Sequence, residues 1–181
     1  MTLPFTAPYV IMALVTLQRL SELVIARRNT KRLMAQGAIE YGAGHYPVMV
    51  TLHAAWLAAL WLSVGQRPVN LVLLGVFAVL QGLRVWVLAV LGPRWTTRII
   101  VLPGAPLVKR GPFRWLSHPN YCVVTAELAV LPLTFGLIGI AALFTLLNAA
   151  MLYVRIGAEA RALRSNAVPR ANRPRLTTTS R

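Results

Sequence analysis

Four long apolar segments constrain this chain more than any other feature. A helix that crosses a membrane needs about 20 mostly apolar residues, and residues 3–26, 46–64, 68–91 and 121–154 all approach or exceed that length. The last segment is too long for one crossing, and it contains Pro132, Gly136 and Gly139. Proline removes a helix hydrogen-bond donor and glycine loosens the backbone, so we expect a tight hairpin there. The pattern predicts an all-α, polytopic membrane helix bundle with about five transmembrane helices.

The composition leaves two classes of function open. Hydrophobic residues make up 57% of the chain, above the roughly 45–50% of ordinary soluble domains. Nineteen Lys and Arg residues stand against four Asp and Glu, which gives a formal net charge of +15. Such an excess fits either nucleic-acid binding or a membrane protein with basic cytoplasmic loops.

The positions of the basic residues favour the membrane protein. They gather after the first apolar segment, after the third and in the C-terminal stretch, whereas the opposite side of the predicted bundle has only Arg67. Because basic loops stay in the cytoplasm, we expect a multi-pass protein of the cell membrane with its N-terminus outside and its C-terminus in the cytoplasm. The chain contains no nucleic-acid-binding signature, so no nucleic-acid partner is predicted.

The chain is expected to form one domain, residues 1–164, followed by a disordered basic tail, residues 165–181. That tail is polar, basic and contains proline, a composition typical of unfolded segments that contact anionic lipid. The single cysteine, Cys122, excludes an intrachain disulfide and a cysteine-based metal cluster.

A polar cluster lies where the long loop 92–120 meets the fourth apolar segment. Its sequence is RGPFRWLSHPNYCVVTAELAV, and His118-Pro119-Asn120-Tyr121 closes the loop. Pro119 suits the first turn of a helix, and free N–H groups at a helix start can bind an anion. The alternative is an ordinary helix start with a satisfied histidine.

Arg155 and Glu159 lie four residues apart near the end of the last apolar segment. At this spacing they share a helix face and can simply pair. The predicted hairpin makes the last two helices antiparallel, so this pair and the His118–Tyr121 cluster are expected at one membrane depth. That convergence indicates a ligand site.

Glu127 is the acidic residue inside the fourth segment, on the order of 10 Å below Tyr121. A carboxylate at that depth is costly unless it is paired or protonated. Two interpretations remain open: an ion pair with Arg84 or Arg19, and a proton acceptor that faces a substrate.

The stretches PLVKRGPFRWLSHPNY and RIGAEARAL resemble the isoprenylcysteine carboxyl methyltransferase family. Its members are integral membrane enzymes that use S-adenosylmethionine. The family pattern has Leu-Val, a Gly-aromatic pair, Arg-His-Pro-x-Tyr and a later Arg-x-x-x-Glu. The resemblance is most specific over residues 91–163, and QRLSELVIARRNTKRLMAQGAIEYGAGHYPVMVTLHAAW is similar to a small bacterial branch.

The resemblance implies a site for the cofactor S-adenosylmethionine, held by a cytoplasmic loop and a C-terminal helix. The cofactor-binding residues would be Leu107, Val108, Phe113, His118, Pro119, Asn120, Tyr121 and Glu159, and Arg155 would face the acceptor. Three positions depart from the family pattern: Ser117 before His-Pro, Ala160 after Glu159, and Ala105 where some members have histidine. These departures bear on the identity of the methyl acceptor more than on the identity of the cofactor.

Methyl transfer suits such residues, because the enzyme mainly aligns donor and acceptor and excludes water. A hydroxyl acceptor must lose a proton near the moment of attack, and Glu127 or His118 is the expected proton acceptor. The predicted partners are a lipophilic small-molecule acceptor and membrane lipid; no metal and no protein partner are predicted. Two alternatives remain: an NADPH-dependent membrane reductase with sterol reductase-like architecture, and a non-enzymatic membrane protein.

Overall fold

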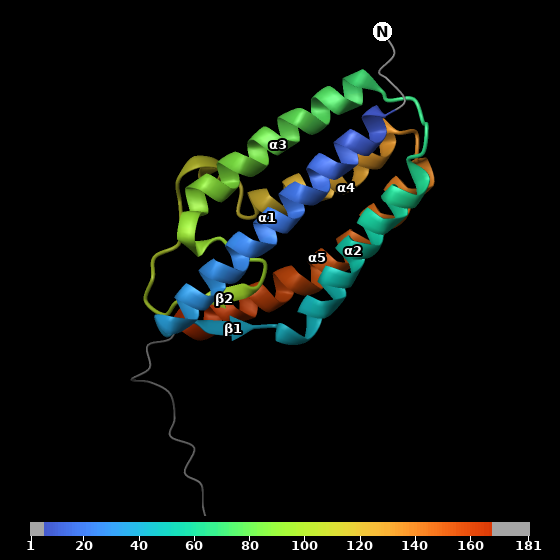
Figure 1. Ribbon diagram of the computed structural model, residues 1–181. Coiled ribbons are helices and arrows are strands. Elements are labelled where there is room, and N and C mark those ends of the chain that lie inside the picture. Colours follow the sequence, from blue (N-terminus) through green and yellow to red (C-terminus); the bar gives the residue numbers. More distant parts are fainter. Residues whose placement is uncertain (1–5, 168–181) are drawn as a thin grey trace, which may run out of the picture.

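The computed structural model describes residues 6–167 as a bundle of five α-helices, with a small two-stranded sheet at one end (Figure 1). Side chains are described as far as residue 164. The helices are α1 (Ala7–Ala35), α2 (Tyr46–Ser63), α3 (Leu71–Leu91), α4 (Pro119–Thr134) and α5 (Ile138–Ala167). The prediction of an all-α membrane helix bundle is confirmed. The expected helix start at residue 3 and residues 168–181 of the expected tail lie outside the described residues.

The outer surface of the bundle is apolar. Leu62, Val72 and Leu146 leave 87%, 78% and 71% of their areas exposed, and patches of this kind mark a surface that meets lipid or a partner. Four helical segments of the described chain are long and apolar enough to cross a membrane. Helix α4 has 16 residues and is about 24 Å long, and it packs against both α3 and α5.

Helix α1 continues to Ala35, well past the predicted end at residue 26. The predicted helix ended where the basic residues begin, but a helix can continue beyond the apolar region of the membrane. The chain leaves the helix at Gly37, two residues after Ala35, where a φ of +86° suits glycine. The Ala38 amide donates to the Leu33 carbonyl and the Gly37 amide donates to the Met34 carbonyl, which together form a Schellman cap.

The predicted hairpin between α4 and α5 is present and uses the same cap. Gly136 has a φ of +70°, the Leu137 amide donates to the Pro132 carbonyl, and the Gly136 amide donates to the Leu133 carbonyl. Pro132 lies in the last turn of α4. The two helices therefore run antiparallel, which brings Tyr121 at the start of α4 beside Arg155 and Glu159 of α5.

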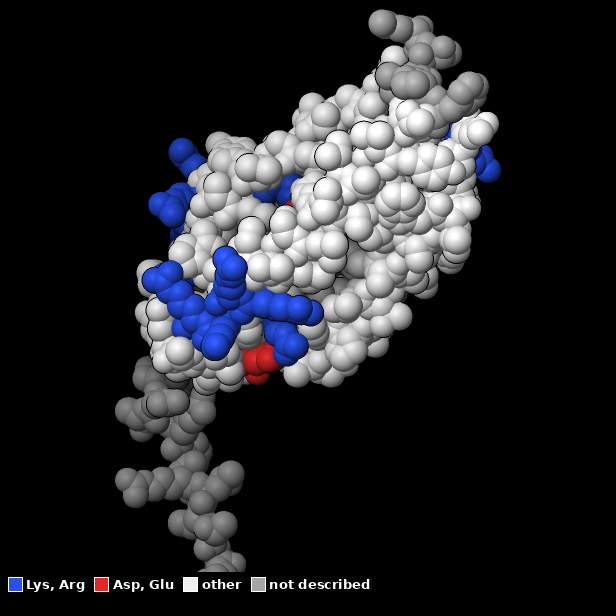
Figure 2. Space-filling view, in the orientation of Figure 1, with Lys and Arg blue, Asp and Glu red and all other residues white. Residues whose placement is uncertain are grey.

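The sheet closes the end of the bundle at which α1, α3 and α5 end (Figure 1). Strand β1 (Ile39–Tyr41) pairs antiparallel with β2 (Ile99–Val101), with Glu40 opposite Ile100. Short 3-10 turns η1 (Ala43–His45), η2 (Gly92–Arg94) and η3 (Gly111–Arg114) complete the connections. We call this end the basic end, because Figure 2 shows Lys and Arg side chains gathered over it while the flank of the bundle in view is largely uncharged.

The interior changes character along the bundle. The half away from the basic end holds an apolar core that includes Met12, Trp56, Leu60, Leu131 and Phe135. Nearer the basic end, α1, α3 and α4 meet around charged side chains. From the basic end inward, the polar residues of the loop 92–120 come first and the layer of charged side chains comes next. The apolar core comes last.

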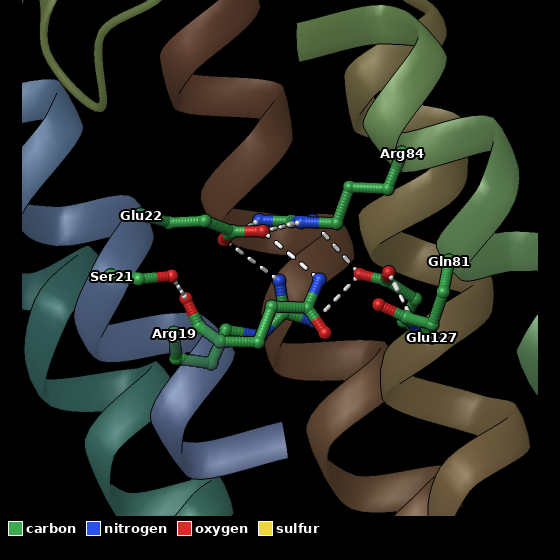
Figure 3. A network of polar contacts seen from close by, with 7 residues as sticks. Arg19, Ser21, Glu22, Gln81, Arg84 and Glu127 are labelled. Atoms are coloured by element: carbon green, nitrogen blue, oxygen red, sulfur yellow. Dashed lines mark hydrogen bonds and ion pairs between the residues drawn. The ribbon is translucent and has the colours of Figure 1, made fainter. Parts of the chain in front are cut away.

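That polar layer is an ion-pair cluster of Arg19, Glu22, Arg84 and Glu127 (Figure 3). Arg84 donates two hydrogen bonds of 2.5 Å to the Glu22 carboxylate and one of 2.9 Å to Glu127. Arg19 donates to Glu127 at 2.8 Å, and Gln81 Nε2 donates to the other oxygen of Glu127. Glu127 is fully buried. The structural alternative for this glutamate, an ion pair with Arg84 or Arg19, is therefore confirmed with both arginines.

Gly111 is expected to be the least replaceable glycine of the long loop. It has a φ of +57°, and a Cβ there would come within 2.7 Å of Val90 Cγ2. Gly104 also has a positive φ, +78°, but a Cβ there meets nothing within 4 Å. Both alanine variants therefore carry backbone strain of about 1–2 kcal/mol, and Gly111→Ala adds an overpacking cost of about 1–3 kcal/mol.

Thermal unfolding in detergent micelles measures the difference between these two variants. Gly111→Ala should unfold at a clearly lower temperature than Gly104→Ala. Equal midpoints would show that the Val90 contact does not constrain the loop.

Candidate functional site

A cleft of about 550 Å³ opens at the basic end, between the loop that follows α3 and the facing sides of α4 and α5. The loop contributes a wall of backbone and apolar side chains, and the two helices contribute the polar groups. The lining includes most of the residues singled out from the sequence: Leu107, Val108, Phe113, His118, Asn120, Tyr121, Arg155 and Glu159. Pro119 begins α4 beside them and is buried.

The Tyr121 hydroxyl joins the two helices at the centre of the cleft. It donates to Glu159 Oε2 at 2.6 Å and accepts from Arg155 Nε at 2.9 Å. Within the described residues, Arg155 and Glu159 thus both bind the tyrosine and form no ion pair with each other. The i,i+4 pair that the spacing allowed is replaced by a bridge from α4 to α5.

His118 extends this arrangement toward the loop. Its ring stacks on the Tyr121 ring with centroids 5.0 Å apart and planes 10° apart. Its Nδ1 lies 3.8 Å from Glu159 Oε2. The side chains of His118 and Glu159 keep 33% and 29% of their area exposed, so both remain accessible from the cleft. The start of α4 explains why the two rings are adjacent. Pro119 is the first residue of α4, so His118 is its N-cap and lies one helical turn before Tyr121.

The Arg155 guanidinium contacts both Tyr121 and Met49. Its guanidinium carbon lies 5.7 Å from the centroid of the Tyr121 ring, and its Nη1 contacts Met49 Sδ at 3.2 Å. The residue is only 6% exposed. A guanidinium that is buried without a carboxylate partner favours an anionic or oxygen-rich ligand nearby.

Two buried polar atoms of cleft residues find no hydrogen-bond partner among the described residues: Trp95 Nε1, a donor, and Asn120 Oδ1, an acceptor. Buried polar groups are normally satisfied, so each such atom calls for an explanation. S-adenosylmethionine carries an ammonium group, a carboxylate, hydroxyls and an adenine ring, and these offer both donors and acceptors. The cleft residues therefore fit this cofactor.

Trp95 and Arg98 line the cleft, although the sequence pattern assigned neither to the site. Trp95 is only 4% exposed, so its side chain lies inside the protein. Arg98 donates to Glu40 on β1 and packs 4.3 Å from the centroid of the Tyr46 ring. The hydrogen bond to Glu40 raises the pKa of the Arg98 guanidinium above its ordinary value, so this side chain stays cationic. No local signal could have found it, because the β1–β2 pairing creates the contact.

Glu127 and Pro119 are the two predicted site residues that do not line the cleft. Glu127 belongs to the ion-pair cluster, one layer deeper in the bundle. Its expected role as a proton acceptor stays a prediction, and its contacts favour the structural interpretation.

Comparisons of the sequence with known proteins show what the chain is similar to. The model of the family described as “Isoprenylcysteine carboxyl methyltransferase (ICMT) family” matches residues 71–165. A Bacillus subtilis (strain 168) protein named “Uncharacterized protein YpbQ” is 39% identical over 166 residues, which cover 88% of this chain and 98% of the relative. An “Uncharacterized protein” of Haemophilus influenzae is 28% identical over 111 residues, covering 57% of this chain and 63% of the relative. No solved structure matches the chain.

Proposed function

The chain belongs to the isoprenylcysteine carboxyl methyltransferase family, and from this premise we propose that it is an S-adenosylmethionine-dependent O-methyltransferase of the membrane. Members of the family use S-adenosylmethionine as methyl donor. The acceptor would be a lipophilic molecule with a carboxylate or a phenol- or pyrone-type hydroxyl. The relatives that match carry no name that identifies an acceptor.

One observation carries the proposal: Tyr121, Arg155 and Glu159 form a single hydrogen-bonded bridge across the cleft. When bound, S-adenosylmethionine supplies a methyl group on a cationic sulfur and is left as a neutral thioether. An anionic carboxylate and aromatic faces attract such a cation. Glu159 would hold the polar end of the cofactor, and the Tyr121 ring would face the sulfonium.

The remaining residues would complete the cofactor pocket. Leu107, Val108 and Phe113 give the loop wall an apolar surface. Asn120 Oδ1 and Trp95 Nε1 would find in the cofactor the partners they lack. Closing such a wall over the reacting groups excludes water and fixes their alignment, which is the main contribution an enzyme makes to methyl transfer.

Arg155 would steady the acceptor oxygen, because it lies at the inner end of the cleft and its charge favours an oxyanion. An acceptor hydroxyl must also lose its proton. Of the two expected proton acceptors, His118 lines the cleft and Glu127 does not. We therefore propose that a ring nitrogen of His118 accepts this proton.

We infer the orientation of the protein from the distribution of its charges. The basic end carries the loops after α1 and α3, and Arg67 lies in the connection at the opposite end. With the basic end in the cytoplasm of a cell membrane, the soluble cofactor would enter the cleft from water. The acceptor would approach within the bilayer, since the flanks of the bundle are apolar.

Methyl transfer into lipid tests the proposal directly. Purified protein, methyl-labelled S-adenosylmethionine and a total lipid extract should give a labelled lipid that mass spectrometry identifies. Mild alkali distinguishes the two acceptor groups, because it releases methanol from a methyl ester and leaves a methyl ether intact. Binding of NADPH without binding of S-adenosylmethionine would instead support the reductase alternative and contradict the proposal.

A further inference from the structure

A second cavity, of about 510 Å³, lies beside the cleft at the basic end. Its floor is apolar and comes from Leu33 at the end of α1 and from Val90 and Leu91 at the end of α3. Its rim carries four basic residues and no acidic residue: Arg32, Arg94, Lys109 and Arg110. We call this cavity the basic pocket.

The described part of the protein does not neutralise the charges of the rim. The ion pairs formed within residues 6–164 involve none of the four rim residues. All four side chains belong to exposed residues. Arg94 donates to the Pro106 carbonyl at 2.6 Å and Arg110 donates to the Val90 carbonyl at 3.3 Å. These bonds hold two guanidinium groups in place and leave their remaining N–H groups for an anion.

The fold gives the pocket fixed walls. Asn29 of α1 donates to the Gly92 and Trp95 carbonyls at 3.2 and 2.8 Å, which ties the end of α1 to the turn after α3. The pocket is therefore bounded on one side by a helix and on the other by the loop that also lines the cleft, since Leu107 and Val108 border both cavities.

The chemistry of the lining selects an amphiphilic anion. Arginine and lysine groups recognise phosphate oxygens, and basic pockets at the cytoplasmic ends of membrane helices suit lipid head groups. The apolar floor would accommodate glycerol and the first carbons of acyl chains, which a free phosphate ion lacks. The ends of α1 and α3 place the pocket where head groups lie.

We propose that the basic pocket binds the head group of an anionic phospholipid. The phosphate contacts the basic rim, and the glycerol lies on the apolar floor. The pocket adjoins the cleft and shares part of its wall, including Arg94 and Lys109, whereas Arg32 and Arg110 line the pocket alone. The proposal does not depend on the proposed reaction, although bound lipid would contact the loop segment that borders the cleft.

Native mass spectrometry of the full chain, released from detergent micelles, measures lipid binding without the cofactor. Phosphatidylglycerol should bind in preference to phosphatidylcholine. The double variant Arg32→Gln, Arg110→Gln should bind phosphatidylglycerol about 30-fold more weakly, from the loss of two direct contacts between a basic group and the phosphate.

The matched control is the double variant Arg27→Gln, Arg28→Gln. It removes the same charge from exposed positions of the same helix end, outside the pocket lining. It should change the affinity less than about threefold. Equal losses in the two double variants would show diffuse attraction between charges and overturn the proposal.

Two further outcomes would also overturn it. One is equal binding of phosphatidylglycerol and phosphatidylcholine by the wild-type chain. The other is displacement of phosphatidylglycerol by inorganic phosphate at equal concentration, which would assign the rim to a free anion. Thermal unfolding of both double variants establishes that each remains folded, so that a loss of binding is a loss of the site.

Discussion

Glu159→Gln is expected to weaken the binding of S-adenosylmethionine by about 100-fold, which corresponds to the loss of one strong interaction with a charged group. The substitution keeps the size of the side chain and its ability to accept from the Tyr121 hydroxyl. What it removes is the negative charge that faces a cationic ligand. Isothermal titration calorimetry in detergent micelles measures the dissociation constant.

A pair of tyrosine variants controls for general effects on α4 and α5. Tyr121→Phe removes the hydroxyl that joins Glu159 to Arg155 and should also weaken binding. Tyr153→Phe, on α5, removes a hydroxyl from a residue that is 84% exposed and should bind like the wild type. Unchanged binding in both Glu159→Gln and Tyr121→Phe would show that the cofactor lies elsewhere.

Arg84→Met is expected to destabilise the protein by about 3–5 kcal/mol, the usual effect of removing one partner from a buried ion pair. Arg84 binds the Glu22 carboxylate through two nitrogens and Glu127 through a third. Without it, two carboxylates share Arg19 in the interior of the bundle (Figure 3). Unfolding by sodium dodecyl sulfate, followed by tryptophan fluorescence, measures the loss.

A second substitution tests whether the lost charge balance is the cause. Arg84→Met combined with Glu22→Leu removes one charge of each sign and leaves the Arg19–Glu127 pair intact. Replacing both partners by apolar groups is often neutral, so the double variant should recover much of the lost stability. Arg67→Met, at the opposite end of the bundle, should change stability by less than about 0.5 kcal/mol. A double variant as unstable as Arg84→Met alone would contradict this account.

The helices and the hairpin were predictable because their signals are local. Apolar length identifies a membrane helix, and Pro132 with Gly136 marks the turn between α4 and α5 as the structure has it. The end of α1 was predicted at residue 26, but the helix continues to Ala35. Apolar length indicates only where a helix leaves the membrane, whereas the positive φ of Gly37 marks where the helical conformation stops.

The contacts that join distant segments were only partly predictable. The sequence left open whether Arg84 or Arg19 pairs with Glu127, and it did not predict that both do so. It also did not predict that Arg84 binds Glu22. The three-residue strands β1 and β2 are too short to show an alternating pattern, so the contact of Arg98 with the cleft was missed.

Within the candidate site, sequence spacing found the residues but not their arrangement. Arg155 and Glu159 fall four apart, which favours a direct pair on one helix. The structure instead places the Tyr121 hydroxyl between them, because the hairpin brings α4 against α5. Three-dimensional packing thus converts a common helix pair into a bridge between two helices.

An experimental structure of the protein with bound S-adenosylmethionine tests the central claim most directly. The account predicts the cofactor in the cleft at the basic end, with its cationic part beside Glu159 and Tyr121 and with Leu107 and Val108 along its other side. A cofactor bound away from this cleft, or Tyr121 and Glu159 separated on opposite sides of the membrane, would contradict it.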